Sequence, residues 1–244
     1  MTSVRQLAAC MGITRDFSIL REFFGFFRGR LPSDPTGAAV VVSLRRQATR
    51  LRGRHHDLNC IAIGEDQFTD ADDERIDYAI YRMRDIYDPA SLGVARVHHF
   101  GVSTADADGL DSPTTRDDLE EITDRWSAAN NGIDLFFPHN MNVDSVLGRS
   151  AVEGPCEDKD DKGMNGSVSG LWGRDQTART VSHEVGHYLG LEHNHDAGDC
   201  PASAAGRRRL MAQSGCASNI RTSVELTSAE AKEMRAHCLV RGGC

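Results

Sequence analysis

The chain has 244 residues, of which 39% are hydrophobic and 26% charged, and its formal net charge is −8 at pH 7. This balance is typical of a globular protein that is long enough to bury one well-formed core. The negative charge argues against a protein that binds nucleic acid or anionic membranes, and no apolar stretch is long enough to span a bilayer. We expect a monomer.

The first part of the chain is set apart by its composition. An aromatic cluster, FFGFF, precedes the breaker sequence LPSDPTG at residues 31–37, and proline, glycine and aspartate in such a run mark a connection between structural units. We predict an N-terminal extension or pro-segment over residues 1–35 and one folded domain over residues 36–244. We predict no signal peptide, because no long apolar core precedes a small-residue cleavage site.

Short runs bounded by turn residues predict the strands. The β-branched runs at residues 38–44, 58–64 and 94–104 are typical strand sequences, and the apolar run at residues 133–138 predicts a buried strand. The segment GSVSGLWG at residues 166–173 is interpreted as an edge strand beside the helix that follows it.

Helical periodicity appears in two segments between these strands. Residues 72–88 carry apolar side chains with a period near 3.6, which predicts a helix with one buried face. Residues 116–132 have acidic residues near the start and end at Asn-Asn-Gly, as a helix with a favourable dipole arrangement does. A third helix is expected to begin near Asp175 or Thr177, since either residue can cap it.

A closing helix is predicted over residues 227–240. Thr227 is a suitable N-cap, and Glu230 three residues later completes a capping box. Met234 lies on this helix, so packing in the core is its expected role. The strands and helices in this order indicate one folded domain that combines a sheet with helices.

The most informative run is HEVGHYLGLEH at residues 183–193, with the spacing H-E-x-x-H-x-x-G-x-x-H. Four residues of a helix advance by about 400°, so His183 and His187 project from one face, one turn apart. Their ring nitrogens can meet on one metal ion at about 2.0–2.1 Å. Glu184 lies beside that face, where it can contact a water molecule on the metal.

Gly190 explains how a third ligand reaches the ion. Glycine adopts the left-handed backbone conformation that ends a helix with a sharp turn, and His193 follows three residues later from beneath. Three protein ligands leave one position for water, which is the arrangement of catalytic zinc. The pattern therefore predicts a Zn²⁺ hydrolase in which the metal activates water and Glu184 is the general base.

The extended motif resembles the metzincin clan of zinc endopeptidases, and its wording is closest to the matrixin-like members. The likeness covers about residues 177–214. It implies an α+β catalytic domain, with a twisted mixed β-sheet and two long helices above an irregular lower part that contains a Met-turn and a C-terminal helix. Met211, in RRRLMAQSGC, is the candidate for the Met-turn, an apolar floor beneath the ligands; plain core packing is the alternative. Asn194 and the lack of a tyrosine after Met211 fit no single family signature, so the family within the clan stays open.

The resemblance also implies how a protein or peptide substrate binds. In such enzymes an extended peptide lies along the edge strand above the metal and shares main-chain hydrogen bonds with it. We assign this role to the predicted edge strand, and an ordinary edge strand is the alternative. The assigned residues are Gly166, Ser167, Val168, Ser169, Gly170 and Leu171.

Seven cysteines are many for a reducing compartment, so we expect a secreted or otherwise exported protein. A bridge between Cys200 and Cys216 would pin the loop that carries the predicted Met-turn. Cys60 is expected to be a buried thiol on a strand. Further candidates for pairing are Cys156, Cys238 and Cys244.

Two acidic runs raise Ca²⁺ as an alternative cofactor. Neither matches the twelve-residue calcium loop, so solvated acidic loops are the favoured interpretation. Among the other histidines, His195 is an alternative third ligand, two residues beyond His193. His98 and His99 face opposite sides of a strand and cannot share a metal. The acidic residues are Asp106, Asp108, Asp111, Asp158, Asp160 and Asp161.

Two other functions remain open. The first is a toxin or effector protease with one intracellular target and a narrow substrate profile. The second is a non-catalytic binding module stabilised by zinc. Glu184 argues against the second, because a structural zinc site has no use for that carboxylate and usually closes its fourth position.

Overall fold

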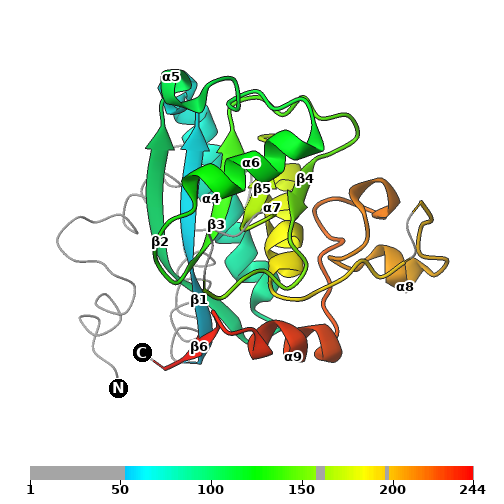
Figure 1. The fold of residues 1–244 in the computed structure, drawn as a ribbon. Coiled ribbons are helices and arrows are strands. Elements are labelled where there is room, and N and C mark those ends of the chain that lie inside the picture. Colours follow the sequence, from blue (N-terminus) through cyan, green and yellow to red (C-terminus); the bar gives the residue numbers. More distant parts are fainter. Residues whose placement is uncertain (1–52, 158–162, 196–197, 244) are drawn as a thin grey trace.

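A six-stranded sheet lies at the centre of the computed structural model, which describes residues 53–157, 163–195 and 198–243. The strand order is β2–β1–β3–β5–β4, and β6 pairs with the start of β1. The pairs among β1, β2, β3 and β5 are parallel, whereas β4 and β6 run antiparallel to their neighbours (Figure 1). The strands are β1 Arg54–Ile63, β2 Leu92–Val102, β3 Gly132–Pro138, β4 Gly148–Ser150, β5 Ser167–Ser169 and β6 Arg241–Gly242.

Helices cover both faces of this sheet (Figure 1). Helices α4 (Asp70–Tyr87) and α7 (Arg174–Tyr188) share one core with the sheet, and α6 (Arg116–Trp126) shares the core on the other face. Successive side chains of a strand point to opposite faces, so Leu58 of β1 joins the first core and Ile61 joins the second. The shorter helical segments are η1 Glu65–Gln67, α5 Thr104–Ala107, α8 Ala204–Arg207, η2 Ser214–Cys216 and α9 Ser228–Ala236.

The mixed α/β architecture agrees with the sequence analysis. Strands at residues 58–64, 94–104 and 133–138 and the helix at residues 72–88 are confirmed, with bounds shifted by a few residues at most of their ends. The strand expected at residues 38–44 lies outside the described residues. So does the boundary between the extension and the folded domain.

Helix α6 is shorter than predicted, because it ends at Trp126 and not at the Asn-Asn-Gly sequence. The residues after Trp126 leave the helical conformation because they form polar contacts with distant parts of the chain. The backbone N–H of Ala128 donates to Asp134 at 3.1 Å, and Asn59 donates to the side chain of Asn130 at 2.8 Å. These contacts join the turn to β1 and β3, and a local sequence pattern does not reveal them.

The prediction of an edge strand at residues 166–173 was wrong. Strand β5 occupies only Ser167–Ser169, and it is hydrogen-bonded to β3 on one side and to β4 on the other. The strand at this edge of the sheet is β4, which no sequence pattern indicated. Residues 167–169 of the predicted edge strand are buried, because β4 pairs with them on the outer side.

The start of α7 also differs from the prediction. Gly173 is the N-cap, and no side chain caps the helix. The expected caps make other contacts. Thr177 accepts a hydrogen bond from the backbone N–H of Trp172 at 2.8 Å, and Asp175 accepts one from the hydroxyl of Tyr78 at 2.8 Å. The second contact joins α7 to α4, as does the bond from Tyr87 to the backbone oxygen of Ser182.

After α7 the chain follows an irregular path to α9. The capping box predicted for α9 is present: Glu230 N–H donates to the Thr227 hydroxyl at 3.2 Å, and Thr227 N–H donates to the Glu230 carboxylate at 2.7 Å. Met234 is fully buried in the first core, so its predicted packing role is confirmed. The helix ends at Ala236, four residues before the predicted end.

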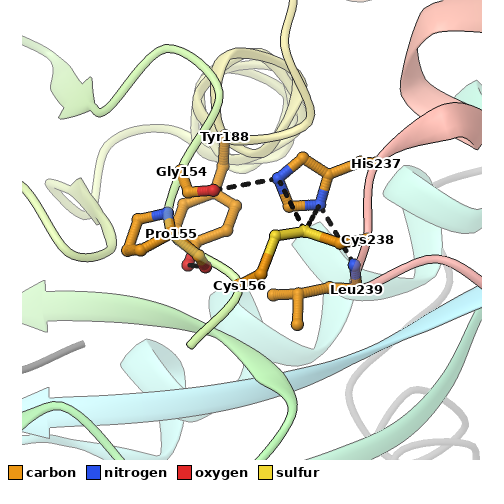
Figure 2. Close-up of a disulfide and its surroundings, with 7 residues drawn as sticks. All are labelled: Gly154, Pro155, Cys156, Tyr188, His237, Cys238 and Leu239. Carbon is orange, nitrogen blue, oxygen red and sulfur yellow. Dashed lines mark hydrogen bonds between the residues drawn. A yellow bond between two sulfur atoms is a disulfide. The ribbon is translucent and has the colours of Figure 1, made fainter. Parts of the chain in front are cut away.

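Two disulfides hold this last part of the chain. Cys200–Cys216 is the predicted bridge, and Cys156 pairs with Cys238. Figure 2 shows the second bridge beside Tyr188 at the end of α7. Cys60 is buried in β1, as predicted. In the part of the chain that the structure describes, no helix is long and apolar enough to cross a membrane.

Candidate metal centre

Three imidazole rings converge at the end of α7. The Nε2 atoms of His183 and His187 lie 3.1 Å apart, and the Nε2 atom of His193 lies 3.1 Å from the first and 3.2 Å from the second. Four nitrogen atoms around a tetrahedral ion at about 2.05 Å would be about 3.3 Å apart. The three side chains therefore fit one zinc-sized cation, as the spacing predicted.

The turn after α7 brings the third ring to the other two. Gly190 has a φ of +105°, a left-handed conformation that glycine adopts without steric strain. Its N–H donates to His187 O at 2.8 Å, and Leu191 N–H donates to Gly186 O at 3.0 Å, which together form a Schellman motif. Gly190 thus ends the helix, and the reversed chain carries His193 back beneath it.

Backbone carbonyls orient two of the rings. His183 Nδ1 lies 2.8 Å from Leu210 O, and His187 Nδ1 lies 2.6 Å from Leu191 O. A carbonyl oxygen can only accept, so both Nδ1 atoms carry the proton and both Nε2 atoms present a lone pair. This is the tautomer that a metal ligand requires, and its orientation by a second partner is typical of metal-binding histidines.

Burial keeps these rings neutral. Loss of solvent lowers the pKa of His187 to about 4 and holds the pKa of His183 well below its usual value, and the neighbouring His187 acts in the same direction on His183. Burial also lowers the pKa of His193, with His195 as the second cause. Near neutral pH the cluster therefore offers uncharged nitrogen ligands to a cation.

Glu184 faces the same cleft as the three histidines. The cleft has a volume of about 700 Å³, and strand β4 forms one of its walls. Burial raises the pKa of Glu184 to about 8, while the positive charge of Arg179 acts in the opposite direction. A carboxyl group with a raised pKa is a stronger base when ionised, which suits proton transfer near neutral pH.

Gly148 lets β4 approach Glu184 closely. A Cβ atom at this position would lie 2.7 Å from Glu184 Cγ and 2.8 Å from Thr180 Cγ2. No side chain larger than hydrogen fits there without moving one of them. The sequence analysis did not identify Gly148, since a three-residue strand without β-branched residues gives no strand signal.

Arg179 connects α7 to the chain beneath the histidines. Its buried guanidinium donates to Ser223 O at 3.0 Å, to Leu210 O at 3.0 Å and also to Ala212 O. Leu210 O accepts from His183 as well. Arg179 thus fixes the carbonyl that orients one ring. The sequence offered a signal that was missed: Arg179 precedes His183 by four residues, which places a cation on the ligand-bearing face.

Met211 lies between these carbonyls and is fully buried. Its sulfur would be 3.1 Å from a Cβ atom on Gly186, so the side chain packs directly against α7 between the first two histidines. Gly186 has no side chain, which makes this close packing possible.

The other candidate ligands do not join the cluster. His195 accepts a hydrogen bond from Gln213 N–H at 3.1 Å and stacks on His193, so His193 supplies the third nitrogen. Two of the three calcium candidates in the described part of the chain already bind other side chains: Asp106 accepts from Ser103 at 2.6 Å, and Asp111 accepts from Gln67 at 3.0 Å. The second acidic run, Asp158, Asp160 and Asp161, lies outside the described residues.

The described residues contain one other group that could hold a metal ion, formed by Cys156, His237 and Cys238. The two thiols are joined in a disulfide here. His237 donates from Nε2 to Gly154 O at 3.0 Å, as Figure 2 shows. This group lies against the C-terminal end of α7, because Gly154 N–H in turn donates to Tyr188 O at 2.8 Å.

Comparison with known proteins places this geometry in context. The model of metallo-peptidase family M12 matches residues 71–223. A comparison with curated proteins gives no match.

Solved structures give distant likenesses. Metalloproteinase-II from Bacteroides fragilis is similar with a TM-score of 0.50 and 12% identity, over 77% of this chain and 54% of that one. Archaemetzincin from Methanopyrus kandleri matches with a TM-score of 0.46 and 12% identity, over 75% and 95% of the chains. A chain in a chaperone–substrate complex matches with a TM-score of 0.46 and 14% identity, over 77% and 35%. The chain thus spans about half of metalloproteinase-II and about a third of the chain in the chaperone–substrate complex.

Proposed function

The chain belongs to metallo-peptidase family M12, and from this premise we propose that it is a zinc-dependent endopeptidase. The observation that carries the proposal is the convergence of three Nε2 atoms within 3.2 Å of one another beside a carboxylate in an open cleft. His183, His187 and His193 would hold the ion, which supplies Lewis acidity that polarises a carbonyl and lowers the pKa of water when it is bound.

Glu184 is the proposed general base. Its position one residue after His183 on α7 directs it into the cleft, where it takes a proton from the attacking water and delivers it to the departing amine. Arg179 keeps the histidine-orienting carbonyl of Leu210 in place, and Met211 supports the rings from below as the proposed Met-turn residue. We propose on these grounds that the enzyme belongs to the metzincin clan.

The substrate backbone is proposed to lie along β4. This strand is one of the two edge strands of the sheet. It lines the cleft with the three histidines and has β5 on one side only. An extended peptide can add to such an edge through main-chain hydrogen bonds. The proposal moves the substrate-binding segment from residues 166–171 to Gly148–Ser150, because β5 is already paired on both sides.

Two disulfides in the described part of the chain, Cys156–Cys238 and Cys200–Cys216, support an exported protein. Such bonds persist in oxidising compartments and are rare in the cytosol. We therefore propose that the enzyme acts after export. The monomeric state expected from the sequence stays a prediction.

The proposal is tested by replacing the base. Glu184→Gln should bind one zinc ion as tightly as the parent and cleave an unstructured protein at least about 1,000-fold more slowly, because the amide cannot accept the proton. Glu192→Gln is the matched control, since Glu192 lines the same cleft but is exposed. A chelator should abolish turnover of the parent, and added zinc should restore it. Equal activity of Glu184→Gln and the parent would refute the assignment.

A further inference from the structure

We propose that the cleft selects a substrate residue with an acidic side chain next to the bond that is cut, through the hydroxyl groups of Thr180 and Ser214. This inference rests on the proposed peptidase function and names the class of substrate. The two residues are called the hydroxyl pair below. Both line the cleft that holds His183 and Glu184.

The hydroxyl pair lies beside the reacting groups. Thr180 precedes Glu184 by one helical turn, so both side chains project from the same face of α7. Gly148 closely approaches Glu184 and the methyl carbon of Thr180, so Thr180 lies at the edge strand on which the substrate backbone is proposed to lie. Ser214 lines the same cleft. A substrate side chain that points from that strand towards the hydroxyl pair therefore belongs to a residue that flanks the scissile bond.

Gln176 joins the two hydroxyl groups. Its amide nitrogen lies 3.0 Å from Thr180 Oγ1 and 3.1 Å from Ser214 Oγ and donates to both. Arg179 Nη1 donates to the same Ser214 oxygen at 3.0 Å. A hydroxyl oxygen accepts at most two hydrogen bonds and donates one. Ser214 therefore has both acceptor positions filled and only its proton left to offer.

Thr180 is in a similar position. In the middle of a helix, a threonine hydroxyl commonly donates to the carbonyl four residues earlier, and Ser182 does so towards Ala178 O at 2.8 Å. Among the described residues Thr180 forms no such bond, while it accepts from Gln176. Both members of the pair are thus available as donors towards the cleft, and a substrate group must supply acceptors.

A positive charge behind the pair favours a carboxylate over an amide. Arg179 is buried, and all of its hydrogen bonds go to uncharged oxygens. In the described part of the chain it forms no ion pair. Its charge reaches the cleft through Ser214. The side chain of Arg116 also lines the cleft, as does that of Arg149, which is paired with Glu120. Hydrogen bonds to charged groups are stronger than those between neutral groups.

The experiment uses peptides that are identical except at the two residues flanking the scissile bond, where Glu, Gln or Leu is placed in turn. The zinc-loaded parent should cleave the Glu peptide at one of these positions with a kcat/KM at least about tenfold above that of the Leu peptide, and Gln should fall between them. Ser214→Ala and Thr180→Val should each lower the Glu-to-Leu ratio several-fold. Gln176→Glu should lower it further, because the new carboxylate takes both hydroxyl protons. Gln213→Ala, a neighbouring cleft residue, should leave the ratio unchanged.

Ratios measured within one protein preparation do not depend on how much of a variant is folded. Binding of the same peptides to zinc-loaded Glu184→Gln gives a second measurement that requires no turnover. If the Glu peptide binds more tightly than the others but the parent cleaves none of them, the acidic subsite is supported and the peptidase function is refuted. If the parent cleaves the Glu and Leu peptides at equal rates, or prefers Leu, the acidic subsite is refuted and the peptidase function is supported.

Discussion

The two parts of the molecule that meet at Gly190 are held together in different ways. The part before it consists of a sheet between helices, and its order comes from two hydrophobic cores. The part after it has only short helices and the short strand β6, and a few of its side chains, such as Met234, pack into the first core. Cys200–Cys216 lies within this part, whereas Cys156–Cys238 and the hydrogen bonds from Arg179 of α7 to its backbone oxygens join it to the first part. The metal centre draws two ligands from the first part and one from the second. Its geometry therefore depends on contacts that fix one part against the other.

The largest expected effect follows from removing the bridge between the two parts. Cys156–Cys238 spans 82 residues and Cys200–Cys216 spans 16. Because a cross-link restricts the unfolded chain more when its loop is longer, Cys156→Ser with Cys238→Ser should lower the free energy of unfolding by about 4.5 kcal/mol. The second pair replaced in the same way should lower it by about 3 kcal/mol. Urea denaturation measures both, and an equal loss from the two pairs would contradict the explanation.

Arg179→Leu should have the next largest effect. It leaves the backbone oxygens of Ser223, Leu210 and Ala212 without their buried donor, which should lower the free energy of unfolding by about 4 kcal/mol. Zinc affinity should fall as well, because Leu210 O orients His183. Arg208→Leu is the control in the same part of the chain. Arg208 pairs with Glu225 at the surface and should contribute less than about 0.5 kcal/mol. Unchanged zinc affinity in Arg179→Leu would contradict the positioning role.

A substitution in the first part should separate stability from metal binding. Ile80 is fully buried on α4, away from the cleft, so Ile80→Ala should lower the free energy of unfolding by about 3 kcal/mol through the cavity that it leaves. The folded fraction should still bind zinc with the affinity of the parent, as measured by titration below the unfolding transition. Glu74→Ala, at an exposed position of the same helix, should change neither quantity measurably. A matching loss of zinc affinity would indicate that the two parts are not separable.

This contrast also explains what the sequence could predict. Apolar periodicity located α4, and short β-branched or apolar runs located β1, β2 and β3, since burial in the core decides whether these elements form. The His183–His193 spacing located the three rings because helix geometry and Gly190 determine their positions locally. Other features depend on partners far away in the chain. These features are the pairing of β5 on both sides, the short strand β4 and the early end of α6. The contacts of Arg179 go to backbone oxygens more than 30 residues later, and backbone oxygens carry no sequence signal.

The central claim is that three imidazoles, and no thiol, hold one zinc ion. X-ray absorption at the zinc edge of protein loaded with one equivalent tests this directly. The account predicts nitrogen and oxygen neighbours only, at about 2.0–2.1 Å, with the outer-shell scattering of three imidazole rings. A sulfur neighbour at about 2.3 Å, as the group of Cys156, His237 and Cys238 would give, or the scattering of fewer than three rings, would contradict it.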